Sequence, residues 1–175
     1  MKRMLLWLGG GIVLVLAVVL LTGLALPREH RVQSCVTLAA PAESVWAVMR
    51  DIGGTPAWWH DMERATPADS GGVERWTESA GGFSMTLRVA EVTPGHRFDT
   101  TIEPPPDAVF GGVWRHEVNA ADAGGTTACL TEEGWVSNPA YRAIGYLMGQ
   151  RKTIDSYLTA LAARFGSAAR PEHRD

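Results

Sequence analysis

The sequence predicts an α+β domain in which a curved antiparallel sheet wraps one long helix, preceded by an apolar N-terminal helix. Three observations predict this class. The chain begins with a long uncharged run, continues with short runs of alternating apolar and polar residues between Gly and Pro turns, and then changes to a three- and four-residue apolar period. Alternation is typical of strands with one buried face, and the later period is typical of an amphipathic helix.

The first segment is apolar enough to predict a transmembrane helix. Met4–Leu26 holds 23 residues without a charge, and a helix needs roughly 20 apolar residues to cross a bilayer. Lys2 and Arg3 precede this run and favour a cytoplasmic N-terminus. We therefore expect residues 1–27 to form a single-pass anchor in the cell membrane, with an extracytoplasmic domain after it. The alternative is a signal peptide cleaved after Ala25, which leaves a secreted or periplasmic domain.

The remainder of the chain has the size of one domain. We expect residues 28–166 to form it and residues 167–175 to form a flexible polar tail. The formal net charge is −3 and the basic residues are scattered, so the composition excludes a nucleic-acid footprint. Six of the seven Trp residues follow the anchor, which predicts an aromatic core, pocket or interface.

Seven strands are expected in this domain. The first is Arg31–Leu38, where apolar residues gather on one face of the alternation. Pro41 then opens a short helix that ends before Asp51, and a second helical turn carries Trp58 and Trp59. Gly and Pro turns separate six further strands. These are expected at Met62–Thr66, Val73–Ser79, Phe83–Val92, Arg97–Glu103, Gly112–Ala120 and Thr126–Val136.

The last segment predicts one long amphipathic helix. Asn138-Pro139 is a suitable start, and Gly166 ends the pattern. Between them apolar residues recur at three- and four-residue steps for about seven turns. They are Tyr141, Ile144, Leu147, Met148, Ile154, Leu158, Leu161 and Phe165.

Several short phrases follow one another in a characteristic order. They are APAESVW at 40–46, FGGVW at 110–114, GGTT at 124–127, TEEG at 131–134, Asn138-Pro139, and Tyr157-Leu158 followed by Leu161. With the order of elements, they resemble the START-like helix-grip (SRPBCC) superfamily, in its polyketide cyclase/dehydrase and lipid-transport branch. The resemblance implies a seven-stranded sheet that grips the C-terminal helix around an apolar cavity. It does not imply one chemistry, because this fold hosts carriers, sensors, cyclases and hydrolases.

Alternation and the resemblance together predict a ligand cavity. Trp58 is expected at its entrance, and Gly145 and Gly149 leave room on the helix. The alternatives are that the glycines permit close helix–sheet packing and that Trp58 packs on the sheet edge. The expected cavity residues are Trp58, Met85, Leu87, Val89, Phe98, Ile102, Phe110, Trp114, His116, Leu130, Glu132, Ile144, Gly145, Met148 and Gly149.

His116 and Glu132 are the polar groups expected to face this cavity, because they alternate onto the sides of Trp114 and Leu130. A buried carboxylate beside a histidine could act as general acid and base, so both are catalytic candidates. The alternatives are a hydrogen-bonded pair at the cavity mouth and two solvated groups that never meet. No metal, nucleotide or nucleophile-elbow motif occurs in the sequence, so we expect no metal and no cofactor.

Cys35 and Cys129 alternate onto the outer face of their strands. The resemblance implies that the first and last of the seven strands are antiparallel neighbours, which brings the two cysteines close to direct opposition. We therefore expect a cross-strand disulfide, which suits an exported domain. Two unpaired thiols are the alternative.

The leading functional hypothesis is a membrane-tethered protein that binds a hydrophobic small molecule or lipid between the sheet and the C-terminal helix. Its expected partners are this ligand and, through residues 4–26, the membrane; no nucleic-acid partner is expected. Binding is favoured over catalysis. Two alternatives stay open: a cyclase or dehydratase acting on an apolar substrate, and an envelope interaction module whose cavity is filled by side chains.

Overall fold

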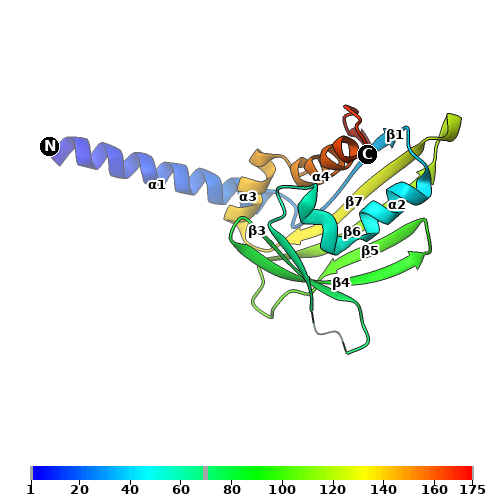
Figure 1. Cartoon of the computed structure of the whole chain (residues 1–175). Helices are drawn as coiled ribbons and strands as arrows, with labels where there is room; N and C mark the ends of the chain where they lie inside the picture. Colours follow the sequence, from blue (N-terminus) through cyan, green and yellow to red (C-terminus); the bar gives the residue numbers. More distant parts are fainter. Residues whose placement is uncertain (1, 69–70, 175) are drawn as a thin grey trace.

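A computed structural model describes residues 2–68 and 71–174 of the chain. Helices cover one face of a curved sheet, and one further helix projects away from the domain (Figure 1). Met1 and Asp175, at the ends of the predicted anchor and tail, lie outside the described residues. The helices are α1 (Lys2–Ala25), α2 (Ala42–Arg50), α3 (Pro139–Met148) and α4 (Lys152–Arg164), with short 3-10 helices η1 (Ile52–Ala57) and η2 (Asp122–Gly124).

The sheet has eight antiparallel strands in the order β2-β3-β4-β5-β6-β7-β1-β8. The prediction of seven strands is therefore wrong. The additional strand, Glu172–Arg174, pairs with β1 so that His173 faces Ser34. Its residues are all polar, so it lacks the alternation by which the other strands were predicted. The strands are β1 (Glu29–Leu38), β2 (Arg64–Pro67), β3 (Arg75–Ala80), β4 (Phe83–Thr93), β5 (Arg97–Ile102), β6 (Phe110–Ala120), β7 (Thr126–Val136) and β8 (Glu172–Arg174).

α1 extends away from the rest of the molecule (Figure 1). Within residues 2–68 and 71–174, no helix is long and apolar enough to cross a membrane. The predicted transmembrane helix is therefore wrong, and the absence of charge in Met4–Leu26 was not sufficient evidence for a span. The domain end of α1 packs against α3. A Cβ at Gly23 would lie 1.8 Å from the carbonyl oxygen of Pro139, so only glycine permits this contact.

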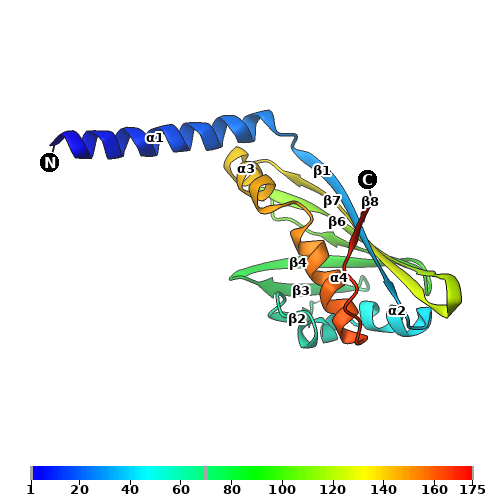
Figure 2. The same cartoon turned by 90° about the horizontal axis from the view of Figure 1, so that it is seen from above.

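The C-terminal segment forms two helices rather than the one that was predicted. Gly149 follows α3 with a φ of 88°, and the chain then restarts as α4 at Lys152. A positive φ ends a helix, and glycine adopts it without steric cost. Figure 2 shows the result: α4 crosses the sheet, α3 lies near the base of α1, and β8 lies beside β1.

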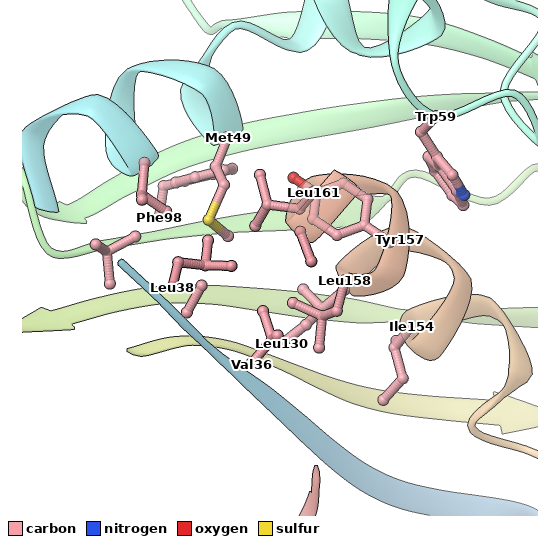
Figure 3. Close-up of a cluster of buried hydrophobic side chains, with 14 of the residues drawn as sticks. Val36, Leu38, Met49, Trp59, Phe98, Leu130, Ile154, Tyr157, Leu158 and Leu161 are labelled. Carbon is pink, nitrogen blue, oxygen red and sulfur yellow. The ribbon is translucent and has the colours of Figure 1, made fainter. Parts of the chain in front are cut away.

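The core lies between the sheet and α4, chiefly along the C-terminal half of that helix, with Ile154 buried nearer its start. Leu158 and Leu161 of α4 are fully buried, and they meet Leu38 of β1, Phe98 of β5 and Met49 of α2 (Figure 3). Burial of such side chains stabilises the fold by roughly 1.5–3 kcal/mol each. This packed cluster fixes the position of α4 over the sheet.

Cys35 and Cys129 form a disulfide across β1 and β7. The two residues are direct Cα partners in the antiparallel register and are 94 residues apart in sequence. Their neighbours Val36 and Leu130 point to the opposite, concave face and are buried there. The disulfide therefore lies on the outer face of the sheet, behind the packed core.

Candidate functional site

A cavity lies between the concave face of the sheet and the N-terminal half of α4. Its volume is about 230 Å³. Strands β3 to β7 supply one wall, and α2, η1, the loop after η1 and α4 supply the other. The lining residues are Met49, Ile52, Thr55, Trp59, Met62, Glu78, Ala80, Met85, Leu87, Phe98, Thr100, Ile102, Trp114, His116, Glu132, Thr153 and Tyr157.

Strand register aligns the side chains of the sheet wall. Trp114 of β6 lies between Thr100 of β5 and Glu132 of β7. Leu87 of β4 is the partner of Ile102 of β5. Directly opposed residues project from the same face of an antiparallel sheet, and alternate residues along a strand share that face. The wall is therefore continuous from β4 to β7 and largely apolar.

Aromatic rings close the cavity around Tyr157. The ring centroid of Tyr157 lies 5.2 Å from that of Trp59, 6.2 Å from Trp114 and 5.8 Å from His116. Trp59 is held in place because its Nε1 donates a hydrogen bond to Ser156 Oγ at 3.1 Å. In Figure 3, Trp59 lies on the Tyr157 side of the buried cluster, away from Leu38. Edge-on contacts of this kind give the cavity a rigid aromatic end.

His116 is buried in the cavity wall and stacks on Phe98, with ring centroids 4.2 Å apart. Burial lowers the pKa of its imidazole to about 3, and the nearby charge of Asp99 opposes this shift only in part. Its Nδ1 has no hydrogen-bond partner within the described part of the chain. His116 is therefore a neutral imidazole at physiological pH, with one ring nitrogen available to a bound molecule.

Glu132, the other predicted catalytic residue, interacts with a different histidine. Its Oε1 lies 3.0 Å from Nε2 of His30 on β1, and the side chains are 16% and 21% exposed, His30 and Glu132 respectively. Glu132 and His116 line the same cavity, but no hydrogen bond joins them in the described residues. The strand register explains the pairing, because Glu132 and Val32 are Cα partners and His30 lies two residues along the same face of β1.

Glu78 of β3 is a site residue that the sequence analysis missed. It lines the cavity, and burial raises the pKa of its carboxyl group to about 7. Its carboxyl group makes no hydrogen bond or ion pair with another described residue, whereas its backbone carbonyl accepts a hydrogen bond from the Ser84 hydroxyl. Burial of the Tyr157 phenol raises its pKa, and the charge of Glu78 across the cavity adds to this shift. The alternation of Trp76, Glu78 and Ala80 was the available signal, since it places one acidic residue between two residues that face inward.

The other predicted cavity residues have several locations. Val89 and Leu130 lie in the packed core. Trp58 lies outside the lining and packs against Tyr157, with ring centroids 5.0 Å apart. Phe110 lines a different hollow of about 540 Å³, at the edge formed by β4, the proline loop and the start of β6. Ile144 is 46% exposed on α3.

Gly145, Met148 and Gly149 line a second hollow, beneath α3. Its volume is about 470 Å³, and it is bounded by the start of β1, the end of β7 and the start of α4. Glu132 and Thr153 line this hollow as well as the cavity, so the two spaces share a wall. We refer to the first space as the cavity and to the second as the α3 hollow.

In the part of the chain that the structure describes, no three His, Cys, Asp or Glu residues are placed to hold a metal ion. The polar groups of the cavity are a neutral imidazole, a phenol, threonine hydroxyls and two carboxyl groups. Such a set can hydrogen-bond a ligand carbonyl or hydroxyl and can transfer a proton. Neither action requires a cofactor.

Comparison with known proteins adds a family and a fold. Residues 29–166 match a family model described as polyketide cyclase / dehydrase and lipid transport. Among curated proteins, no sequence matches the chain.

Several solved structures share the fold. An aromatase/cyclase, Zhui, from Streptomyces sp. R1128 is 18% identical with a TM-score of 0.64, over 79% of this chain and 94% of that one. A START superfamily protein from Mycobacterium smegmatis is 16% identical with a TM-score of 0.61, over 78% and 97%. A protein from Thermobifida fusca is 23% identical with a TM-score of 0.61, over 78% and 93%. At these identities the likeness concerns the fold.

Proposed function

Because the chain belongs to the polyketide cyclase/dehydrase and lipid transport family, we propose that it binds an apolar small molecule or lipid chain in the cavity. The observation that carries the proposal is the cavity itself. Most of its lining is aliphatic or aromatic, and the rings of His116 and Tyr157 lie 5.8 Å apart within it. An apolar enclosure with a few placed polar groups is typical of small-molecule sites.

The size of the cavity limits its occupant. Its 230 Å³ is below the range of about 300–1,000 Å³ that is usual for drug-sized ligands. The cavity therefore suits a short apolar molecule, or the apolar end of a longer one.

A cavity-filling variant tests binding. Ala80 lines the cavity, so Ala80→Phe should fill part of it, whereas Ala90→Phe on exposed β4 adds the same volume outside. The probe is N-phenyl-1-naphthylamine, whose fluorescence rises in an apolar site, added to the full chain. We expect binding by the wild type and Ala90→Phe, and about tenfold weaker binding by Ala80→Phe. Equal binding by the two variants would contradict the proposal.

Catalysis of the cyclase or dehydratase type is a second candidate, and Glu78 favours it. A carboxyl group with a pKa of about 7 is present in both protonation states at neutral pH. It could remove the proton beside a substrate carbonyl and return it to a departing hydroxyl, while neutral His116 or the Tyr157 hydroxyl donates a hydrogen bond to the carbonyl oxygen.

Deuterium exchange tests this second candidate without knowledge of the substrate. In D₂O, the wild-type protein should accelerate exchange at the carbon beside the carbonyl of a medium-chain β-hydroxy ketone, followed by NMR. Glu78→Gln keeps the size of the side chain and should lose the acceleration, and Glu63→Gln on the exposed loop should retain it. No acceleration by the wild type counts against catalysis.

We also propose that the domain works in an oxidising, extracytoplasmic compartment. The Cys35–Cys129 disulfide supports this, because cytosolic proteins rarely keep structural disulfides. Alkylation of the protein in its own host before lysis should leave both thiols unlabelled. Two labelled thiols would contradict the proposal.

A further inference from the structure

The α3 hollow differs from the cavity in its charge. Arg28, Arg142 and Lys152 contribute three cationic side chains to its lining, against the carboxylates of Glu29 and Glu132. Arg31 also lines the hollow, but it already forms an ion pair with Glu133. The carboxylate of Glu132 already interacts with His30. The hollow therefore has an excess of positive charge, whereas the adjoining cavity is mainly apolar.

Arg142 is the residue that indicates a missing partner. It is only 8% exposed, and its Nε is buried without a hydrogen-bond partner in the described residues. Its Nη1 donates to the carbonyl oxygen of Leu26 at 3.3 Å, and no described carboxylate lies within ion-pair distance. A buried guanidinium without a counter-ion is costly, because it has lost its hydration. An anion in the hollow would supply that counter-ion and could accept two hydrogen bonds from the guanidinium of Arg142.

The two spaces adjoin along the side chains of Glu132 and Thr153, which line both. A molecule that extends past these side chains would place one end in the cavity and the other in the hollow. Gly145 and Gly149 leave the α3 side of the hollow open, since a Cβ at either position would meet no atom within 4 Å.

We propose that the α3 hollow binds the anionic head group, a carboxylate or phosphate, of an amphipathic ligand whose apolar part occupies the cavity. This inference rests on the proposed binding function and deepens it. Arg142 binds the head group directly, and Lys152 adds charge at the rim. The His30–Glu132 pair lies at the junction, where Nε2 of His30 is 3.0 Å from Oε1 of Glu132.

Three ligands with one chain length test the proposal: decanoate, decyl phosphate and decanol. Each displaces N-phenyl-1-naphthylamine from the full-length protein, below its micelle concentration. We expect at least one anion to bind about tenfold or more tightly than decanol, because a charge-assisted pair adds to the same apolar burial. The anion that binds more tightly identifies the head group.

Arg142→Gln keeps a donor for the Leu26 carbonyl and removes the charge. It should reduce anion affinity about tenfold and leave decanol unchanged. The matched control is Arg64→Gln, an exposed arginine on β2 at the other edge of the sheet, which should change neither. If Arg142→Gln does not fold by circular dichroism, Lys152→Gln decides, with an expected loss of about threefold for the anions.

These measurements distinguish a failure of the head-group site from a failure of the proposed cavity function. Decanol binding with no preference for either anion overturns the head-group site and leaves the proposed cavity function intact. Full anion preference in folded Arg142→Gln, or in Lys152→Gln when that variant decides, also overturns it. Absence of binding by all three ligands and by the probe overturns both proposals.

Discussion

The two ends of α4 cover different environments. Around Leu158 and Leu161 the space above the sheet is filled by fully buried aliphatic and aromatic side chains. Tyr157, which directly precedes Leu158, and Thr153, about one turn earlier, line a cavity that the same sheet and helix enclose. The same helix therefore packs in the core and also lines the cavity. The close packing at one end holds the helix in position over the sheet, so that the cavity at the other end does not collapse.

The largest expected effect concerns the disulfide behind the packed end. Cys35 and Cys129 close a loop across 94 residues, and the loop-entropy relation gives roughly 4–5 kcal/mol for a loop of this length. The double variant Cys35→Ala, Cys129→Ala should lose most of this free energy of unfolding in urea titrations. If the loss is below about 1 kcal/mol, packing of β1 on β7 suffices without the disulfide.

Alanine substitutions at two positions of α4 compare its two ends directly. Leu158→Ala removes a fully buried side chain from the packed end and should cost about 2–5 kcal/mol of unfolding free energy. Thr153→Ala at the cavity end should cost less than about 1 kcal/mol, because its side chain borders open space. Urea denaturation measures both. Equal costs would mean that the cavity end is packed as tightly as the core.

The cavity end should also make stability depend on pH. The folded-state pKa of Glu78 is raised from 4.5 to about 7, so the native protein binds more protons than the unfolded chain between these values. The free energy of unfolding should therefore fall as pH rises from 4.5 to about 7, by roughly 3 kcal/mol in total. Glu78→Gln should remove this contribution. The raised pKa of Glu78 would be contradicted if the wild-type free energy of unfolding rose or stayed flat from pH 4.5 to about 7 and Glu78→Gln showed the same pH dependence.

The smallest effect concerns the aromatic end of the cavity. Trp59→Phe keeps most of the ring area but removes the hydrogen bond from Nε1 to Ser156, so a loss of about 1 kcal/mol is expected. Trp58→Phe is the matched control and should change stability less, since no hydrogen bond of its ring nitrogen occurs among the described residues. A larger loss for Trp58→Phe would show that ring packing matters more than this hydrogen bond.

Much of the fold could be predicted because the strands bury one face. Alternation located the cores of β1 to β7, and the family resemblance is confirmed. The three-residue β8 is polar and gave no signal. The break at Gly149 was missed because the apolar period continues across it from α3 into α4. The transmembrane prediction was wrong because a long uncharged run was taken as sufficient evidence for a span, and no helix within residues 2–68 and 71–174 is long and apolar enough.

The site was harder to predict than the fold. Alternation identifies the face of a residue but not its neighbour on another strand. The pairing of Glu132 with His30 spans 102 positions and depends on the β1–β7 register. Glu78 was overlooked because an acidic residue in a strand is usually solvated, whereas this one lines the cavity. The burial of Arg142 without a counter-ion could not be predicted, because it results from how α1, α3 and β1 pack together.

The break at Gly149 divides the helical segment that covers the sheet into two helices, α3 and α4. Their sequences can change independently of each other. α3 borders only the charged hollow, whereas α4 carries the core residues and one edge of the apolar cavity. Substitutions in 139–148 can therefore alter head-group preference without disturbing the anchoring leucines, and substitutions at the start of α4 can alter chain length. We expect related sequences to diversify fastest in α3, and engineered specificity to be easiest to introduce there.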